Sequence, residues 1–174
     1  MYKVEIIAAS NKIFGEFSDY CLNISDEIFF RQPTDKWSIA QNVDHLVIST
    51  KQTKLAYSLP KFILRLYTGK PNRSSRTYEE LVKKYLAKLD AGGKASGIFI
   101  PKSISDTSKE NLINKWMKIS SAYLQTFENN WKEEQLDNYL APHPLLGKIT
   151  LRELCYFTIY HTEHHLDIIK QRQQ

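Results

Sequence analysis

The feature that most constrains the fold is a set of four long stretches in which apolar residues recur at spacings of three and four. They cover residues 2–22, residues 38–59, a stretch that follows Thr107, and a stretch that follows Thr150 and continues almost to the C-terminus. Such spacing places the apolar side chains on one face of an α-helix. Because 174 residues is a length typical of one domain, the four stretches predict a single all-α domain over residues 1–174, built as a four-helix bundle.

Three of the four stretches begin with the signature of a capping box, in which Ser or Thr is followed three residues later by Glu or Gln. The pairs are Ser38 with Gln41, Thr107 with Glu110, and Thr150 with Glu153. In a capping box the two side chains bond the free backbone N–H groups at the start of a helix. The start signals and the apolar stripes therefore predict the same helices.

The connection between the second and third predicted helices is about fifty residues long, which is too long for a simple turn in a bundle. Within this crossover, residues 77–90 (TYEELVKKYLAKLD) have the pattern of a short extra helix, and the Gly92-Gly93 pair ends it. The only β-like run is the short GIFIP at residues 97–101. We therefore expect a long crossover that contains one short helix. The sequence gives little support for strands.

The composition is that of a folded, soluble protein with reduced cysteines. The hydrophobic fraction is 42%, and no stretch approaches the roughly 18 consecutive apolar residues of a membrane span. The N-terminal sequence has no apolar core or cleavage site of a signal peptide, so we expect a cytoplasmic protein with no membrane partner. Cys21 and Cys155 lie in apolar stripes without a C-x-x-C spacing, which indicates buried thiols.

Basic residues are concentrated in the crossover. Between Lys61 and Lys102 the sequence has ten Lys or Arg and three acidic residues, although the whole chain carries a net charge of only +5. Such a segment attracts nucleic acid, anionic small molecules or acidic proteins, and it can also be an ordinary solvated surface. Because it has neither interleaved aromatic residues nor a recognition-helix signature, we expect no nucleic-acid partner.

Three of the five histidines lie on the last predicted helix. At about 100° per residue, His161 and His165 fall within roughly 20° of the direction of Leu154, on the apolar stripe, whereas His164 lies about 80° away at its edge. Two imidazoles one turn apart on the same face suit the binding of one metal ion. An inward histidine can instead be a hydrogen-bonded core residue, but burying two without a metal or polar partners costs several kcal/mol.

A third metal ligand has two candidates, His45 and His143. His45 lies on a face of the second helix whose other members are small or polar: Ser38, Asn42, Ser49, Gln52 and Ala56. Such residues leave room for a cavity and supply hydrogen-bonding groups, so we expect Asn42, Ser49 and Gln52 to line the pocket or to orient its ligands. His143 is flanked by two prolines in the segment APHPLLG, which favours a role in fixing a loop or lining the rim of the pocket.

Two segments resemble the signature segments of the DinB-like superfamily, which is named for a damage-inducible bacterial protein. They are KWSIAQNVDHLVIS (36–49) and HPLLGKITLRELCYFTIYHTEHHLDIIK (143–170), and TYEELVKKYLAKLDAGGKASGIFIPKS (77–103) is similar to one of its subfamilies. A Trp-Ser helix start, a His seven residues after the Ser and a C-terminal H-x-x-x-H recur in order. The resemblance implies a four-helix bundle of the DinB-like type, with a metal bound by His45, His161 and His165.

The resemblance also implies an activity. Characterised members are thiol S-transferases that use bacillithiol or related low-molecular-weight thiols, and a mycothiol-dependent maleylpyruvate isomerase; the family name does not imply DNA binding. We therefore expect a metal-dependent transferase that acts on a small-molecule thiol and an electrophilic substrate, with metal-assisted hydrolysis as another reaction of the same site. Zn²⁺ is the expected ion, and Ni²⁺, Fe²⁺ and Mn²⁺ suit the same ligands. No catalytic residue is assigned, and Glu163 faces away from the interior on the helical wheel.

Other hypotheses stay open. The chain could be a non-catalytic stress-response or binding protein that uses the basic segment 61–102, with a vestigial or structural metal site. In an enzyme, the same cations could hold the carboxylates of an anionic cosubstrate. Aromatic residues on outer helix faces, such as Tyr156 and Tyr160, could form a homodimer or be solvated tyrosines.

Overall fold

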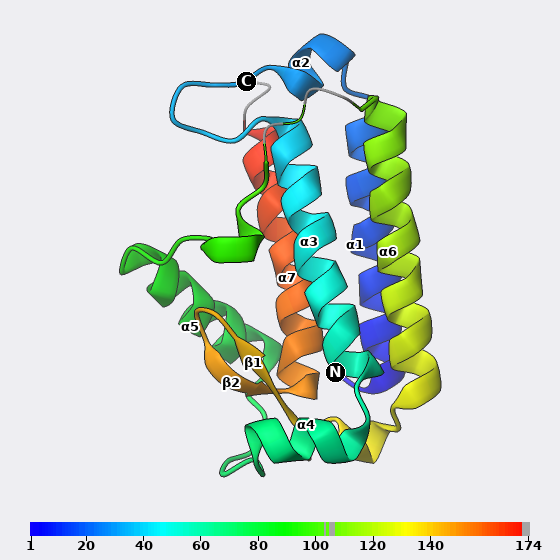
Figure 1. Ribbon diagram of the computed structural model, residues 1–174, viewed down its shortest axis with the longest axis vertical. Helices are drawn as coiled ribbons and strands as arrows, with labels where there is room; N and C mark the ends of the chain where they lie inside the picture. Colours follow the sequence, from blue (N-terminus) through cyan, green and yellow to red (C-terminus); the bar gives the residue numbers. More distant parts are fainter. Residues whose placement is uncertain (103, 105–106, 172–174) are drawn as a thin grey trace.

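The computed structural model describes residues 1–102, 104 and 107–171. Its four long helices are α1 (Lys3–Leu22), α3 (Ile39–Ser58), α6 (Lys109–Asn130) and α7 (Leu151–Lys170). Helices α1 and α3 each pack against both α6 and α7. In Figure 1, α1 and α7 run in one direction and α3 and α6 in the other, so α3 and α7 are antiparallel neighbours. The predicted all-α bundle is confirmed.

Aromatic side chains fill the centre of the bundle. Trp116 of α6 is fully buried and meets Phe14 and Phe17 of α1 edge-on, with ring centroids 5.3 and 5.4 Å apart. Tyr57 of α3 packs edge-on against Phe127 of α6 at 5.3 Å. Full burial of each such side chain stabilises the fold by roughly 1.5–3 kcal/mol. Among the described residues, no helix has both the length and the apolar character needed to cross a membrane.

Two of the three predicted capping boxes are confirmed, at Ser38 for α3 and at Thr150 for α7. The third prediction is wrong by one residue. Helix α6 is capped by Ser108, whose Oγ accepts a hydrogen bond from the backbone N–H of Asn111 at 3.2 Å, and Thr107 lies outside the helix. Both residue types form caps, so the pattern alone does not decide between these neighbours.

The connections between the long helices contain more helix than predicted. The expected short helix is present as α5 (Tyr78–Asp90), but α4 (Lys61–Thr68) precedes it, and α2 (Asp26–Phe30) joins α1 to α3. The run GIFIP does not form a strand, because its first three residues form the 3-10 turn η1 (Gly97–Phe99). Pro60 follows the C-cap of α3, as predicted, because proline has no N–H to continue the helix, and it is also the N-cap of α4.

A two-stranded antiparallel sheet, which the sequence pattern did not predict, precedes α7. Strand β1 (Leu140–His143) pairs with β2 (Gly147–Thr150), and His143 lies opposite Gly147. Gly147 has a φ of 75°, a backbone conformation that favours glycine. Figure 1 shows the hairpin and α5 on the same side of the bundle, next to α7. Together they build a wall beside the face of α7 that carries the histidines.

The two cysteines are buried and free, as predicted. The Cys155 thiol donates a hydrogen bond to the Tyr57 hydroxyl at 2.8 Å, and that hydroxyl donates to the Leu151 carbonyl at 2.6 Å. Burial raises the pKa of Cys155 to about 11 and that of Cys21 to about 12. Both thiols therefore stay protonated at neutral pH and are poor nucleophiles.

Candidate metal centre

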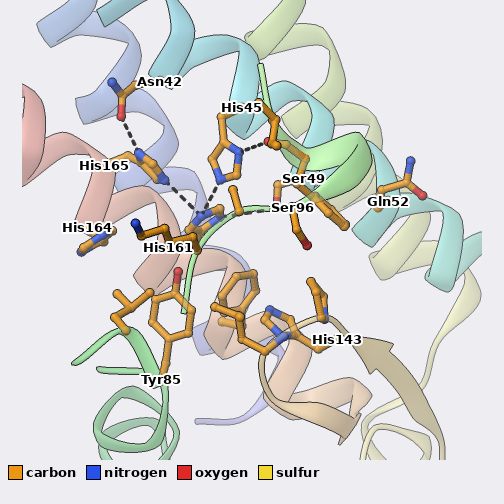
Figure 2. A pocket seen from close by; sticks show the side chains of 18 of the residues that line it. Asn42, His45, Ser49, Gln52, Tyr85, Ser96, His143, His161, His164 and His165 are labelled. Carbon is orange, nitrogen blue, oxygen red and sulfur yellow. Dashed lines mark hydrogen bonds between the residues drawn. The ribbon is translucent and has the colours of Figure 1, made fainter. Parts of the chain in front are cut away.

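Three histidines from two helices converge beside a cavity. His45 lies on α3, and His161 and His165 lie one turn apart on α7; each is 5% exposed. The Nε2 atom of His161 is 3.1 Å from Nε2 of His45 and 3.1 Å from Nε2 of His165. One ring nitrogen from each residue lies within 4.8 Å of the others, and Figure 2 shows the three rings pointing toward one another. The structure thus brings together the three residues singled out in the sequence.

The outer nitrogens of two of these rings are held by the protein. The Nδ1–H of His45 donates to the backbone carbonyl of Phe99 in η1 at 2.7 Å. The Nδ1–H of His165 donates to the side-chain oxygen of Asn42, also at 2.7 Å (Figure 2). Because a neutral imidazole carries one proton, placing it on Nδ1 leaves a lone pair on Nε2. Both rings therefore present an acceptor to the centre of the cluster.

His161 cannot donate a hydrogen bond to both of the neighbouring histidines, His45 and His165. Its Nδ1 lies 3.4 Å from the Ser49 hydroxyl, and its Nε2 faces the Nε2 lone pairs of His45 and His165. A single ring nitrogen donates at most one proton, so at least one pair of lone pairs meets at 3.1 Å without a proton between them. A cation that all three lone pairs can coordinate removes this repulsion. The donor set therefore fits a divalent metal.

Burial keeps these ligands in the form that binds metal. Burial lowers the pKa of His45, although the hydrogen bond to Phe99 opposes the shift. Burial, followed by the neighbouring imidazoles, lowers the pKa of His161 well below its ordinary value of 6.5. Only the neutral imidazole offers a lone pair, so both rings are ready ligands at neutral pH.

A cavity of about 560 Å³ adjoins the three histidines. This volume suits a small organic molecule. Its wall includes Trp37, whose ring is parallel to that of His165 within 7° at a centroid distance of 6.5 Å. The crossover contributes Tyr85 and Lys94, and the hairpin contributes His143. The cavity therefore lies between the bundle and the segments that join its helices.

Comparison with known families agrees with this geometry. A family model of the DinB superfamily matches residues 15–169, a range that contains all three histidines and the residues that line the cavity. The chain belongs to the DinB superfamily. A search of curated protein sequences gave no match. The family match confirms the resemblance seen in the two signature segments, so the cavity between α3, α7 and the crossover is the candidate site of a DinB protein.

The other residues predicted for the site of this DinB chain are placed as follows. Asn42 and Ser49 contact the histidines, whereas Gln52 lines the cavity and lies apart from them in Figure 2. His164 is half-buried at the edge of the cavity and outside the three-nitrogen cluster, which agrees with the helical wheel. Glu163 accepts a hydrogen bond from the Tyr78 hydroxyl, so it joins α7 to α5.

Two functional residues were not predicted from the sequence. The carbonyl of Phe99 orients His45, and Tyr85 projects from α5 into the cavity. No local pattern identifies a backbone carbonyl as a hydrogen-bond partner. Tyr85 was assigned only to a short helix, and its place in the cavity depends on how α5 packs against α7.

The expected outer position of one tyrosine is wrong. Tyr156 is only 2% exposed, and its hydroxyl accepts a hydrogen bond from the terminal amino group of Met1. It is buried because α1 packs against α7 and brings Met1 over this face. Tyr160 is half-buried. A homodimer of this DinB protein stays a prediction, and Tyr156 cannot contribute to it without rearrangement.

Several cations of the basic segment 61–102 make internal contacts. Arg73 and Arg76 form ion pairs with Glu153 at 2.7 and 3.0 Å, and the Glu153 side chain is fully buried. The ammonium group of Lys61 lies over an aromatic ring. These contacts attach the crossover to the bundle, and they leave fewer of its cations free to form a basic binding surface.

Proposed function

We propose that this DinB protein is a metal-dependent enzyme that joins a small-molecule thiol to an electrophilic substrate. The observation that carries the proposal is the convergence of three Nε2 lone pairs, from His45, His161 and His165, beside a cavity. When bound there, a divalent ion supplies a Lewis acid that lowers the pKa of a coordinated thiol or water. Zn²⁺ fits best, because three imidazoles with open positions are typical of catalytic zinc sites, and Ni²⁺, Fe²⁺ and Mn²⁺ suit the same donors.

The chain's own residues prepare the site in two ways. Asn42 and the Phe99 carbonyl hold two rings with their lone pairs directed inward, so no reorientation is needed when a cation enters. The aromatic ring of Trp37 packs against the His45 ring, tilted by 46° at a centroid distance of 5.0 Å, and places an apolar surface beside this ligand. Lys94 lines the same cavity, where an ammonium group suits an anionic cosubstrate.

The non-catalytic alternative receives less support. It requires the basic segment 61–102 to be a free working surface, whereas Arg73 and Arg76 are paired with buried Glu153. The same segment also supplies the Phe99 carbonyl that orients His45. The crossover is therefore better explained as part of the site than as a separate binding surface.

Thiol consumption tests the proposed reaction. The Zn²⁺-loaded protein is mixed with a panel of small thiols and 1-chloro-2,4-dinitrobenzene, with and without a chelator, and an ester of 4-nitrophenol without thiol serves as a test for hydrolysis. We expect thiol-dependent turnover that chelation and His45→Ala abolish, and that His164→Ala retains, because His164 lies outside the cluster. Metal-dependent ester cleavage without thiol turnover would assign the site to hydrolysis. Turnover that survives chelation and His45→Ala would refute metal-dependent chemistry.

A further inference from the structure

The cavity wall that faces the three histidines carries two hydrogen-bond donors that do not belong to the three-histidine cluster. Tyr85 comes from α5 and His143 from the end of β1, and both line the cavity. Their rings are perpendicular, with centroids 6.4 Å apart, and the Tyr85 ring lies 6.4 Å from the His161 ring. Figure 2 shows both on the same side of the cavity, with the Tyr85 hydroxyl directed toward His161.

The hydrogen bonds of His143 determine which of its ring nitrogens carries the proton. Its Nδ1 accepts from the backbone N–H groups of Leu145 and Leu146 at 3.2 and 3.1 Å. An accepting nitrogen needs its lone pair, so the proton of the neutral ring is on Nε2. Burial and the charge of nearby Lys84 lower the pKa of His143 to about 4. The ring is therefore neutral at physiological pH, with a fixed Nε2–H.

This N–H is directed to the cavity. Within the described part of the chain, Nε2 of His143 has no hydrogen-bond acceptor, and it is not among the unpaired polar atoms that are closed off from solvent. Because the ring lines the cavity and packs against Phe157 with centroids 4.1 Å apart, the open side of Nε2 is the cavity side.

The Tyr85 hydroxyl has the same properties. Its ring is 6% exposed and meets Phe157 edge-on at 5.2 Å, which fixes its direction. The hydroxyl is likewise unpaired among the described residues and borders the cavity. A phenol has an ordinary pKa near 10, about three pH units above neutrality, so the Tyr85 hydroxyl keeps its proton and can donate it in a hydrogen bond.

We propose that the Tyr85 hydroxyl and the His143 Nε2–H form a pair of neutral donors that binds a carbonyl or carboxylate oxygen of the small-molecule thiol, while the sulfur of the same molecule lies at the three-histidine site. The inference rests on the proposed function, because the histidines define the other end of the substrate. An sp² oxygen has two lone pairs and can accept from both donors at once. A purely apolar substrate leaves both donors unpaired in a buried site, and the site selects against it.

Thiol probes that differ only at the far end test the donor pair. The Co²⁺-loaded protein is titrated with 3-mercaptopropionate, 3-mercaptopropionamide and 1-propanethiol, and the cobalt absorption bands report thiol binding. We expect at least one oxygen-bearing probe to bind about tenfold more tightly than 1-propanethiol, the effect of one or two hydrogen bonds. Preference for both oxygen probes indicates that a carbonyl is sufficient, and preference for 3-mercaptopropionate alone indicates a carboxylate.

Three variants separate the donor role from a structural one. Tyr85→Phe removes only the hydroxyl. His143→Asn keeps a side-chain oxygen that can accept from the turn N–H groups, and its shorter amide has no N–H at the position of Nε2. His143→Gln instead places an amide N–H near the position of Nε2 and leaves the turn without its acceptor. We expect Tyr85→Phe and His143→Asn to lose the preference for oxygen-bearing probes and to bind 1-propanethiol at least as tightly as the wild-type protein does, because the apolar probe no longer leaves a donor unpaired. We expect His143→Gln to keep that preference.

The outcomes distinguish this inference from the proposed function. If the wild-type protein binds Co²⁺ and thiols but shows equal affinity for all three probes, the donor pair is refuted and the metal site stands. The same conclusion follows if His143→Gln loses the preference and His143→Asn keeps it, because His143 then acts only on the turn. If the protein binds no Co²⁺, the proposed function fails and this inference fails with it.

Discussion

Asn42 joins the start of α3 to the candidate metal centre. Its side-chain N–H donates to the backbone carbonyl of Ser38 at 2.8 Å, which directs the amide oxygen to Nδ1 of His165, 2.7 Å away. The side chain of Ser38 caps α3. The geometry that begins the helix therefore also fixes the tautomer and the ring direction of a ligand on α7.

Replacing Asn42 tests this link. Asn42→Ala leaves His165 without its acceptor, and we expect the affinity for Zn²⁺ to fall about 10- to 100-fold, the usual effect of losing a partner of a metal-binding histidine. Asn42→Asp keeps an oxygen at the same position and is expected to bind Zn²⁺ more tightly than Asn42→Ala. Competition titrations with a chromogenic chelator measure both. Equal Zn²⁺ affinity in the wild-type protein and Asn42→Ala would show that this hydrogen bond does not matter.

The start of α7 is the element that holds the crossover. Glu153 closes the capping box of α7 by accepting from the backbone N–H of Thr150 at 2.9 Å. The same carboxylate accepts two hydrogen bonds from Arg73, at 2.7 and 2.8 Å, and one from the backbone N–H of Arg76. One buried carboxylate thus accepts hydrogen bonds both from the start of its own helix and from a loop some 80 residues earlier in the chain.

This carboxylate makes stability depend on pH. Desolvation alone raises the pKa of Glu153, but the hydrogen bonds from Arg73 and from two backbone N–H groups outweigh it and lower the pKa below 4.5. The ionised form is therefore favoured by folding; its contribution is complete above about pH 4.5 and is lost as the pH falls through the lowered pKa. We expect Glu153→Gln to lose about 1.5–3 kcal/mol of unfolding free energy at pH 7.

Urea unfolding across pH measures this contribution. Between about pH 5 and pH 3 the wild-type protein should lose more stability than Glu153→Gln, because the variant has no carboxylate to protonate at this position. Parallel pH profiles for the two proteins would mean that the Arg73–Glu153 pair contributes nothing to the pH dependence.

The N-cap of α6 gives a second prediction about the stability of a single helix. The Ser108 hydroxyl accepts from the backbone N–H of Asn111, so Ser108→Ala is expected to cost about 1 kcal/mol of unfolding free energy. The neighbouring Thr107→Ala is the matched control and should change stability by less than about 0.5 kcal/mol. Chemical unfolding measures both, and the reverse order would restore the cap predicted from sequence.

At the scale of the whole molecule, the sequence predicted the bundle because each long helix carries its own signals. A stripe such as that of α6 repeats over several turns, and boxes such as those at Ser38 and Thr150 mark the starts. The short elements lack this repetition. Helix α4 buries only Leu64 and Thr68, and each strand of the hairpin has four residues, which is too short for an alternation to stand out.

The residues of the candidate site likewise fall into those that the sequence predicted and those that it did not. His161 and His165 could be paired from their spacing alone, since four residues on a helix correspond to one turn. His45 had only the character of its own helix face in support until the family resemblance was considered. The Phe99 carbonyl and the Tyr85 hydroxyl reach the site only through packing of the crossover against α3 and α7, and such long-range placement leaves no local pattern.

Metal binding should stabilise the whole fold, because its ligands join α3 to α7. At a free Zn²⁺ concentration 100 times the dissociation constant, a site present only in the folded state adds about 2.7 kcal/mol. We expect the melting temperature to rise with Zn²⁺ in the wild-type protein and to stay constant in His161→Ala. Differential scanning calorimetry measures this shift, and an equal rise in the variant would place the bound metal elsewhere.

Metal content tests the three-histidine site most directly. The measurement is elemental analysis of the wild-type protein, purified without an affinity tag and loaded with divalent metal, beside His165→Ala and the neighbouring control His164→Ala. We expect about one equivalent of divalent metal in the wild-type protein and in His164→Ala, with far less in His165→Ala. The reason is that His165 belongs to the three-histidine cluster and His164 does not. A folded wild-type protein that retains no metal after loading, or a His165→Ala variant that retains as much as the wild type, would contradict it.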